Sequence, residues 1–235
     1  MNFAIREAGL QEEMDDPACD LELLNRTYAH FALMNRLVSG WRRIYRQRFR
    51  PLFRDLNGPI TLLDIGCGGG DVPARLARWS ESDGIDLRIL ATDADERAVT
   101  FARNRRAHDR IEYRCCTLDT LEREHALFDF VLSNHVLHHL TDEETGVFLH
   151  TSARLARRMV LHNDIYRSPV AYYLFKYSMP LLFRNAFTVA DGLRSIRKSY
   201  RTDELAALVP EGWSVYTGVP WRVIVVKQNG TEHDC

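Results

Sequence analysis

The sequence lacks paired cysteines and an excess of either charge. Its five cysteines include no CxxC pair, so neither a zinc site nor a disulfide framework is predicted, and reduced thiols without a bound metal are the simplest interpretation. Lys and Arg number 31 against 32 Asp and Glu, which gives a formal net charge of −1. Because nucleic-acid-binding domains usually carry a basic surface, we expect no nucleic-acid partner.

Long hydrophobic runs are also missing. The most apolar stretch, SPVAYYLFKYSMPLLF (residues 168–183), contains Lys176 and Pro180 and is too short to span a bilayer. The first 16 residues are acidic and include no apolar segment of the kind found in secretory signals. We therefore expect a cytoplasmic protein with no stable membrane insertion. Its content of 46% hydrophobic and 27% charged residues is typical of a globular enzyme.

Breaks in the chain predict two regions. Residues 1–57 are expected to form an N-terminal tail and helical cap, with residues 1–16 as a loose tail and Asp20 capping a helical region that ends near Arg54. The triplet Asn57-Gly58-Pro59 disfavours both helix and strand. Residues 58–235 are therefore predicted as the main domain.

Strand-like and helix-like segments alternate through this domain. Apolar runs typical of buried strands occur at 60–66, 87–93, 111–116, 128–134, 158–164, 212–218 and 221–228. The alternation predicts an α/β fold: a Rossmann-like, seven-stranded, mostly parallel sheet with helices on both faces and an antiparallel closing pair. Residues 166–200 are predicted as a helical lid inserted after the fifth strand.

A glycine-rich loop follows the first predicted strand. The stretch LLDIGCGGGD (residues 62–71) places four glycines in five residues, with Asp64 before them and Asp71 after them. Ligands of open α/β sheets bind at the carboxyl ends of strands, where glycine lets the backbone approach closely. A dinucleotide site has GxGxxG, but Asp71 stands in place of its third glycine and would repel a pyrophosphate. The pattern DxGxGxG favours a cofactor with positive charge and no phosphate, such as S-adenosylmethionine (SAM).

From this loop onward the chain resembles the class I SAM-dependent methyltransferases. LLDIGCGGG resembles the first motif of that family, LRILATDAD its second strand, and FDFVLSNHVLHHL its fourth strand and the following turn, in the same order. The separation of Asp93 from the loop is close to the ~20 residues at which an acid meets ribose in related sites, although a helix cap would also place an acid there. The residues that the resemblance assigns to SAM, or to its product S-adenosylhomocysteine (SAH), are Asp64, Gly66, Cys67, Gly68 and Gly70 for the methionine part, Asp93 for the ribose, and Ala94, Thr117 and Leu118 for the adenine.

The flanking segments resemble a narrower group of that family. FALMNRLVSGWRRIYR (residues 31–46) resembles the YDxMNxxxSxGxxxxWR segment of ubiquinone and menaquinone C-methyltransferases, and the pair Ser195-Ile196 also matches that group. Phe31 and Ala32 replace its Tyr-Asp pair, and the glycine loop reads GCGGG where that group has GGTG. The resemblance implies a similarly shaped acceptor pocket, not the same substrate.

Polar residues after the fourth and fifth strands are the candidates for chemistry. Asn134 is expected beneath the cofactor. His135 is either a general base for an acceptor hydroxyl or a residue that hydrogen-bonds the cofactor or shapes the pocket. Asp164 either contacts the acceptor or caps a helix. His138 and His139 are expected to be packing or surface residues of a helix.

Three further features flank the predicted site. Tyr28, on the apolar face of the first helix, is either a core residue or a lid over the cofactor. The basic run of Arg194, Arg197, Lys198 and Arg201 either forms a solvated helix face or binds an acidic group of the acceptor. Aromatic residues of the insertion are expected to form an apolar lid over the acceptor: Tyr172, Tyr173, Phe175, Tyr177, Phe183 and Phe187.

Together these features predict a SAM-dependent methyltransferase for a hydrophobic small molecule. The expected acceptor is a phenolic, quinol-like or polyketide-type aromatic, methylated on oxygen or carbon. A non-catalytic SAM-binding scaffold and a nucleic-acid methyltransferase are the alternatives, although the latter more often has Asn/Asp-Pro-Pro-Tyr/Phe where this chain has SNHV (residues 133–136). Both a monomer and a homodimer are compatible with the sequence.

Overall fold

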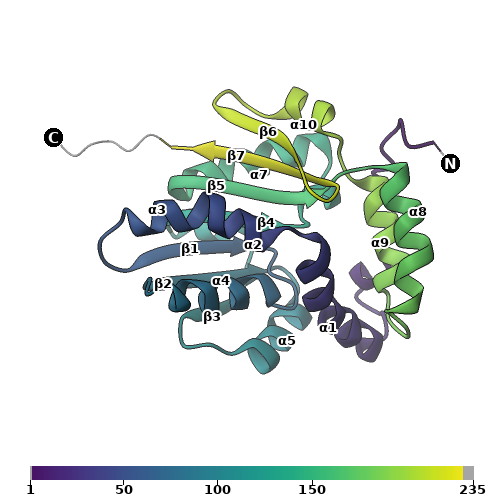
Figure 1. Cartoon of the computed structure of the whole chain (residues 1–235), viewed down its shortest axis with the longest axis horizontal. Coiled ribbons are helices and arrows are strands. Elements are labelled where there is room, and N and C mark those ends of the chain that lie inside the picture. The colour runs from purple at the N-terminus through teal and green to yellow at the C-terminus, as the bar shows by residue number, and fades with distance from the viewer. Residues whose placement is uncertain (1, 230–235) are drawn as a thin grey trace.

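Seven strands form a single sheet at the centre of the molecule (Figure 1). The computed structural model describes residues 2–229. The strand bounds are Ile60–Ile65 (β1), Leu87–Asp93 (β2), Ile111–Cys115 (β3), Phe128–Asn134 (β4), Ala156–Ile165 (β5), Trp213–Gly218 (β6) and Arg222–Gln228 (β7). Each strand lies on a predicted apolar run, and the central strands β1, β4 and β5 have consecutive buried residues because helices cover both faces of the sheet there.

The strand order, β3-β2-β1-β4-β5-β7-β6, contains a switch point between β1 and β4. Strands β1 to β5 run parallel, whereas β7 pairs antiparallel with both β5 and β6. After β3 the chain returns to the other side of β1, and such a reversal opens a crevice at the carboxyl ends of the strands. The predicted Rossmann-like, mostly parallel fold with an antiparallel closing pair is therefore confirmed.

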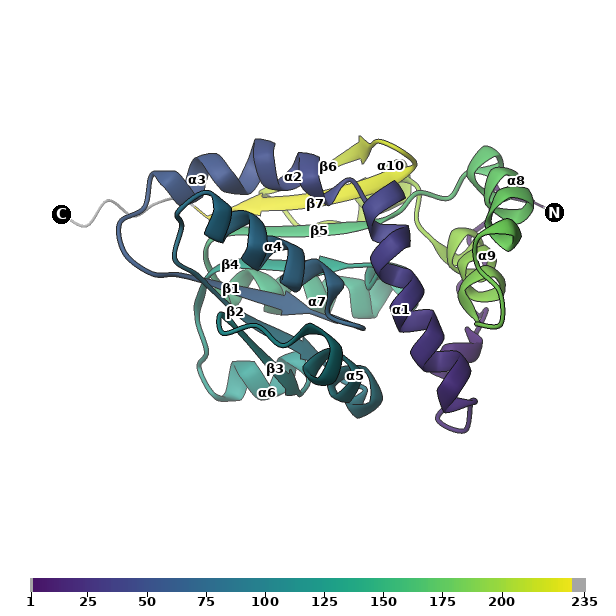
Figure 2. The ribbon, with the colours of Figure 1, turned by 60° about the horizontal axis from the view of Figure 1, so that its bottom comes forward.

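Helices cover both faces of the sheet (Figure 2). One buried apolar cluster joins the sheet to α2, α3 and their connecting turn, and to α4 and α5; a second joins its other face to α6, α7 and α10. The helix bounds are Leu21–Val38 (α1), Trp41–Ile44 (α2), Arg50–Arg54 (α3), Asp71–Ser82 (α4), Glu96–Arg106 (α5), Leu118–Arg123 (α6), Asp142–Arg154 (α7), Pro169–Ser178 (α8), Thr188–Lys198 (α9) and Thr202–Leu208 (α10). Short turns occur at Glu13–Asp15 (η1), Tyr45–Phe49 (η2), Leu137–His139 (η3) and Met179–Leu181 (η4).

The predicted helical cap is present but is bent. Asp20 caps α1 as predicted, because its side chain accepts the backbone N–H groups of Glu22 and Leu23 at 2.8 and 2.9 Å. The chain then turns at Gly40, whose φ of 71° is in the left-handed region that glycine adopts readily. As a result α1 crosses the carboxyl end of the sheet, whereas α2 and α3 pack on its face (Figure 2).

The predicted helical insertion is present as α8, η4 and α9. It lies beyond the carboxyl edge of the sheet, next to α1 (Figures 1 and 2). Among residues 2–229, no helix combines the length and the apolar character that crossing a membrane requires.

The expectation of a loose N-terminal tail is wrong. Residues 2–20, which we call the strap, run along α9 and make specific polar contacts. Arg6 donates to the backbone oxygens of Lys198 at 2.7 Å and Leu140 at 2.6 Å, and Glu7 forms an ion pair with Arg197. The strap therefore ties the insertion to the turn after β4.

Candidate functional site

A cavity of about 960 Å³ opens at the carboxyl ends of β1, β2 and β4. The glycine loop forms one end, and Asn134 and His135 form the middle. The strap, η3, α8 and α9 form the other end, while Tyr28 and Asn35 of α1 contribute a side wall. The cavity therefore connects the predicted cofactor site to the predicted lid.

Asp64 is a buried, unpaired carboxylate at the cofactor end. It closes β1 and is 1% exposed, and neither of its carboxylate oxygens has a hydrogen-bond partner within residues 2–229. Burial raises the pKa of Asp64 well above its usual range, and the charges of Asp71 and Asp93 raise it further. Because a buried unpaired charge is costly, this end of the cavity favours a ligand with a cationic group.

Asp71 begins α4, as predicted. Its Oδ1 accepts a hydrogen bond from Asn35 Nδ2 at 3.1 Å, whereas its Oδ2 has no hydrogen-bond partner in the described part of the chain and lies 3.9 Å from Arg75 Nε. Burial raises the pKa of Asp71, and the Asn35 hydrogen bond opposes this only in part. Helix N-termini often bind phosphate, but this buried carboxylate occupies the first helical turn. The acid therefore disfavours a dinucleotide.

Two glycines of the loop have different roles. A Cβ at Gly68 would meet no atom within 4 Å, so its bare backbone, with φ +51°, faces open space in the cavity. A Cβ at Gly70 would lie 2.8 Å from Tyr113 Oη and 2.9 Å from Ala102 Cβ, and Gly70 does not line the cavity. The structure thus gives Gly70 a packing role, which corrects the expectation that it contacts the cofactor.

Asp93 closes β2 and organises the loop. Its Oδ2 accepts the N–H of Gly68 at 2.8 Å, and its Oδ1 accepts the N–H of Asp95 at 3.0 Å. The residue that caps α5 is Asp95, which accepts the N–H of Arg97 at 2.8 Å. The alternative role of Asp93 as the cap of that helix is therefore wrong. Burial raises the pKa of the half-buried Asp93, and together with the buried Asp64 and Asp71 it makes the cofactor end electronegative.

Tyr28 covers the same end from α1. It is 2% exposed, it lines the cavity, and its hydroxyl donates to Asp95 Oδ2 at 3.4 Å. Every residue predicted to bind the cofactor except Gly70 lines this one cavity, namely Tyr28, Asp64, Gly66, Cys67, Gly68, Asp93, Ala94, Thr117, Leu118 and Asn134. Helix α1 and the carboxyl ends of the strands thus bring distant parts of the sequence to one place.

Asn134 is the centre of a polar network in the middle of the cavity. Its Oδ1 accepts from Trp41 Nε1 at 2.9 Å, from Asn163 at 3.3 Å and from Arg222 at 3.3 Å. Its Nδ2 donates to Asn35 Oδ1 at 3.3 Å. The cap, β4, β5 and β7 are thereby joined at the end of β4.

His135 lies beside this network with its Nε2 occupied. The guanidinium of Arg222 donates to His135 Nε2 at 2.6 Å. Burial and the charge of Arg222 hold the pKa of His135 well below its usual range, while burial lowers the pKa of Arg222 only to about 10. The imidazole is therefore neutral, and its proton is on Nδ1. In this arrangement His135 is a hydrogen-bond donor toward its surroundings and not a free base.

Asp164 does not line the cavity but supports His138, which does. Its Oδ1 lies 2.6 Å from His138 Nδ1, and its Oδ2 accepts the backbone N–H of His138 at 3.0 Å. Burial opposes charge on both groups, but the ion pair prevails: it lowers the pKa of Asp164 and raises the pKa of His138 to about 9. Asp164 therefore contacts the cavity only through His138. His138, expected to be a packing or surface residue of a helix, is a buried ion-pair partner on the 3-10 turn after β4.

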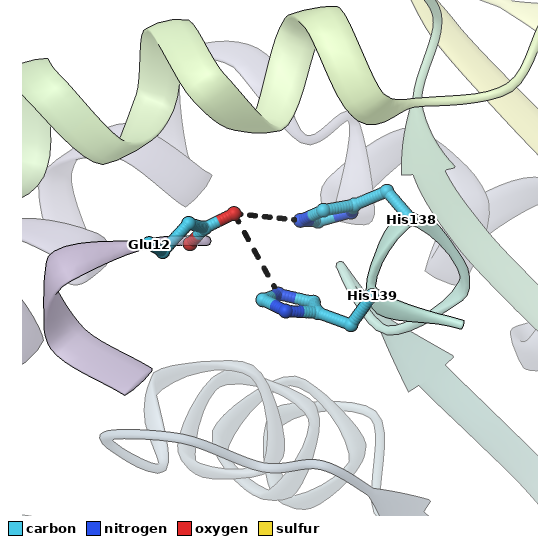
Figure 3. A group of neighbouring side chains, drawn as sticks. All are labelled: Glu12, His138 and His139. Carbon is cyan, nitrogen blue, oxygen red and sulfur yellow. Dashed lines mark ion pairs between the residues drawn. The ribbon is translucent and has the colours of Figure 1, made fainter. Parts of the chain in front are cut away.

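His138 and His139 lie on the 3-10 turn η3, opposite Glu12 of the strap (Figure 3). The Nε2 atoms of His138 and His139 are 3.5 and 3.8 Å from Glu12 Oε1, and both rings line the cavity. Lys198 of α9 also pairs with this oxygen, at 3.0 Å. Lys198 is 3% exposed, which corrects the expectation of a solvated basic face at this position.

The aromatic residues of the insertion separate into two groups. Of those expected in the lid, Phe175 lines the cavity, whereas Tyr173 and Tyr177 are on the exposed outer face of α8. Tyr172, Phe183 and Phe187 are buried but do not line the cavity: they are packing residues. The apolar wall of the cavity is completed by Leu174, Met179 and Ile196.

Comparison with known proteins shows which family part of this chain matches. Residues 62–158 match a family model described as "Methyltransferase domain". The ubiquinone biosynthesis O-methyltransferase of Sinorhizobium medicae is 36% identical over 100 residues, which is 42% of this chain and 37% of that protein. This segment is a class I SAM-dependent methyltransferase domain. The ubiquinone biosynthesis O-methyltransferase of Methylocella silvestris is 34% identical over 133 residues, 54% of this chain and 48% of that protein. The chain thus spans less than half the length of these curated relatives.

Solved structures share the fold of the methyltransferase domain. The plantazolicin methyltransferase BpumL in complex with SAH aligns with a TM-score of 0.60 at 11% identity, over 89% of this chain and 95% of that one. The magnesium protoporphyrin IX methyltransferase ChlM from Synechocystis PCC 6803 with bound SAH aligns with a TM-score of 0.53 at 16% identity, over 82% of this chain and 84% of that one. Because the sequence identities to both structures are below 25%, these alignments show a shared fold only.

Sequence reasoning missed charged residues from the flanks. Glu12 and Arg222 line the methyltransferase cavity, and Lys198 pairs with Glu12. Glu12 is in the presumed tail, Lys198 in a basic helix face and Arg222 in the closing strand. Arg222 alone had a sequence signal, because it stands in the apolar run WRVIVV and a charge in a buried strand requires a partner. The other two are recognisable only once the strap and α9 are packed together.

Proposed function

We propose that this protein is a SAM-dependent methyltransferase that acts on a hydrophobic aromatic small molecule. The observation that carries the proposal is Asp64, a buried carboxylate with no partner in residues 2–229, beside open space over Gly68. A cationic cofactor without phosphate would satisfy this acid, whereas a pyrophosphate would meet the buried carboxylates of Asp64 and Asp71 and the half-buried one of Asp93. The match of residues 62–158 to the methyltransferase family supports the same conclusion.

The cofactor would lie along the glycine loop. Asp64 and the backbone at Gly68 would hold its methionine part, Asp93 the ribose hydroxyls, and Thr117 with Leu118 the adenine. When bound, SAM supplies a methyl group already activated by its sulfonium. The protein's remaining task is to align the acceptor with that methyl group and to exclude water, and Tyr28 contributes to this by covering the loop.

The acceptor would occupy the part of the cavity between His135 and the insertion. Leu174, Phe175, Met179 and Ile196 line this part with apolar surface, which suits a phenolic, quinol-like or polyketide-type ring. The names of the ubiquinone biosynthesis relatives favour methylation on oxygen, and the flank motifs favour methylation on carbon. His135 would donate its Nδ1–H to the acceptor or the cofactor, and Asp164 would position His138.

Calorimetry with SAH and with NAD tests the cofactor. We expect SAH to bind and NAD not to bind. The same protein is then assayed for transfer of labelled methyl from SAM to a panel of alkylated phenols and quinols. SAH binding without transfer to any acceptor would favour the scaffold alternative, and NAD binding without SAH binding would overturn the proposal.

A further inference from the structure

The strap buries one side chain, and it is a carboxylate. Within residues 2–20, Glu12 is the only buried residue; the others are exposed or half-buried. A surface segment usually anchors itself with an apolar side chain, because burying a charge costs desolvation energy. Burying Glu12 therefore requires a site on the body of the protein that suits an anion.

Four donors from two elements converge on one oxygen of Glu12. Ser195 donates its hydroxyl to Glu12 Oε1 at 2.7 Å, and the ammonium of Lys198 is 3.0 Å from the same atom. The Nε2 atoms of His138 and His139 approach it at 3.5 and 3.8 Å (Figure 3). Turn η3 and helix α9 thus form a donor site, and the strap supplies the Glu12 carboxylate; Asp15 Oδ2 of the strap also lies 3.4 Å from His139 Nδ1.

The charges of this donor site balance only when an anion is present. Asp164 keeps His138 protonated and compensates its charge, so Lys198 is left to Glu12. Burial alone would raise the pKa of Glu12, but the His138 hydrogen bond and the positive charges of His138 and Lys198 hold it far below its usual range. Removing the Glu12 carboxylate would leave a buried ammonium without a counter-charge.

The spacing of Glu12, His138 and His139 would also permit a metal ion. A cation is already there, however: Lys198 Nζ lies 3.0 Å from Glu12 Oε1 and 3.0 Å from His139 Nδ1. An ammonium that donates to His139 Nδ1 leaves the proton on Nε2, and that nitrogen then cannot ligate a metal. The cluster is therefore a set of donors around a carboxylate.

We propose that this donor site, formed by Ser195, Lys198, His138 and His139, binds a carboxylate group of the methyl acceptor, and that Glu12 occupies it in the acceptor's absence. The inference rests on the proposed function, since it assigns a substrate class to the same cavity. Ser195, His138 and His139 line that cavity together with the apolar side chains of Leu174, Phe175 and Ile196. Lys198 does not line it, but its ammonium pairs with Glu12, which does. An aromatic acid with an apolar body fits both surfaces.

The strap is suited to release Glu12. Its remaining contacts are mainly polar. They include the partly exposed ion pairs Glu7–Arg197 and Glu13–Arg194, and the hydrogen bonds that the backbone N–H groups of Glu13 and Met14 donate to Asp191. The apolar side chains that the strap packs on the body are few and only half-buried, namely Phe3, Met14 and Cys19, so lifting the strap exposes limited apolar surface. An acceptor carboxylate that enters the site takes over the donors, so the charge balance is unchanged.

Binding of a matched pair of probes to the full chain tests this inference. The probes are 4-butylbenzoate and its neutral counterpart 4-butylbenzamide, titrated with and without saturating SAH. Glu12→Ala vacates the site and should increase benzoate affinity by about tenfold or more. In the wild type the Glu12 carboxylate competes with benzoate, and if it leaves the site free about a tenth of the time or less, the apparent affinity is lowered by that factor. Affinity for the benzamide should not change. Lys198→Met in the same background should remove the gain.

Glu13→Ala is the matched control, because it removes a strap ion pair without vacating the donor site. Glu12→Gln keeps the shape of the side chain, covers the case in which Glu12→Ala does not fold, and should give a smaller gain in the same direction. The inference is wrong if both Glu12 variants bind benzoate no better than the wild type, or if Glu13→Ala gives an equal gain. SAH binding is scored separately, so loss of the proposed function and loss of the subsite are distinguishable.

Discussion

The two ends of the cavity treat buried carboxylates in opposite ways. At the cofactor end, Asp64 and Asp71 have oxygens with no hydrogen-bond partner within the described chain, and burial raises the pKa of both although Arg75 lies 3.9 Å from Asp71 Oδ2. At the insertion end, Glu12 and Asp164 are equally buried, but His138 and its neighbours overcome the effect of burial and lower both pKa values. The chemistry of the side chains is the same, and only their partners differ.

This difference indicates which end depends on a ligand. Unpaired buried acids store unfavourable free energy that a cationic ligand can relieve, so they point directly to the cofactor. Paired acids need no ligand. Glu12 is informative for a different reason: its carboxylate comes from the strap, whereas its donors come from the body of the protein. In this protein the buried acids at the cofactor end lack sufficient counter-charge, whereas the donors at the insertion end are balanced by the Glu12 carboxylate of the strap.

The largest effect is expected from breaking a pair at the insertion end. Asp164→Asn leaves His138 without its counter-charge, and losing one partner of a buried ion pair should lower the free energy of unfolding by about 3 kcal/mol. Urea denaturation measures this loss. The control is Asp142→Asn, at a carboxylate that is 66% exposed, where we expect less than about 1 kcal/mol. Equal losses in the two variants would contradict the assigned pairing.

The same pair predicts a pH dependence of stability. The pKa of His138 is raised from 6.5 to about 9, so its contribution to stability is fully present below pH 6.5 and is lost as the pH rises through 9. One such proton changes the free energy of unfolding by at most about 1.4 kcal/mol per pH unit. In His138→Gln the free energy of unfolding should therefore decrease less steeply between pH 6.5 and 9, by up to that amount per pH unit. Thermal unfolding across this range measures it, and an unchanged slope would show that His138 is neutral in the folded protein.

At the cofactor end the same kind of substitution should act on binding. Asp64→Asn removes the charge that a cationic ligand needs, so the affinity for SAM should fall by roughly 100-fold, a typical cost of removing one partner of a buried charge pair. The unliganded protein should become more stable, because an unpaired buried charge has been removed. Calorimetry and thermal unfolding give the two readouts. Asp86→Asn, at a carboxylate that is 49% exposed, serves as control and should change neither. A parallel loss of stability and binding would argue against the unpaired state of Asp64.

The cofactor end was predictable from the sequence because its signals are local. Asp64 and Asp93 end apolar strands, and in a parallel sheet such ends meet at one edge. The fold followed in the same way from alternating strand and helix patterns. Gly70 was misassigned because the sequence does not distinguish a glycine that faces a ligand from one that accommodates Tyr113.

The insertion end was not predictable because its contacts are distant in the chain. Ser195 and Glu12 are separated by 183 positions, and Arg222 and His135 by 87. Burial of a charge depends on where its partner lies in three dimensions, which local periodicity does not encode. Basic positions on α9 therefore suggested a solvated face, although Lys198 is buried in the structure.

A smaller effect is expected from alanine substitutions of Gly68 and Gly70 in the loop at the cofactor end, and the two substitutions should differ. Both have positive φ, but only Gly70 is enclosed by Tyr113 and Ala102. Gly70→Ala should therefore cost roughly 1–3 kcal/mol of overpacking in addition to backbone strain. Gly68→Ala has open space, so it should lose affinity for SAH and retain more of its stability. Denaturation and calorimetry on both variants make the comparison, and the reverse order would contradict the assignment of Gly68 to the cofactor.

The smallest effect is expected at His135, between the two ends. Arg222 occupies its Nε2 at 2.6 Å, so the ring carries no free lone pair toward the cavity. A general base contributes about 10²- to 10⁴-fold to the rate, whereas loss of a donor should lower kcat by less than about tenfold. We expect His135→Asn, which tolerates the positive φ of 63°, to give that smaller change. Rates against pH with the best acceptor of the phenol panel provide the measurement. A drop of about 100-fold that also removes the acidic limb of the kcat/KM profile would restore His135 as a base, and would require the Arg222 contact to open during turnover.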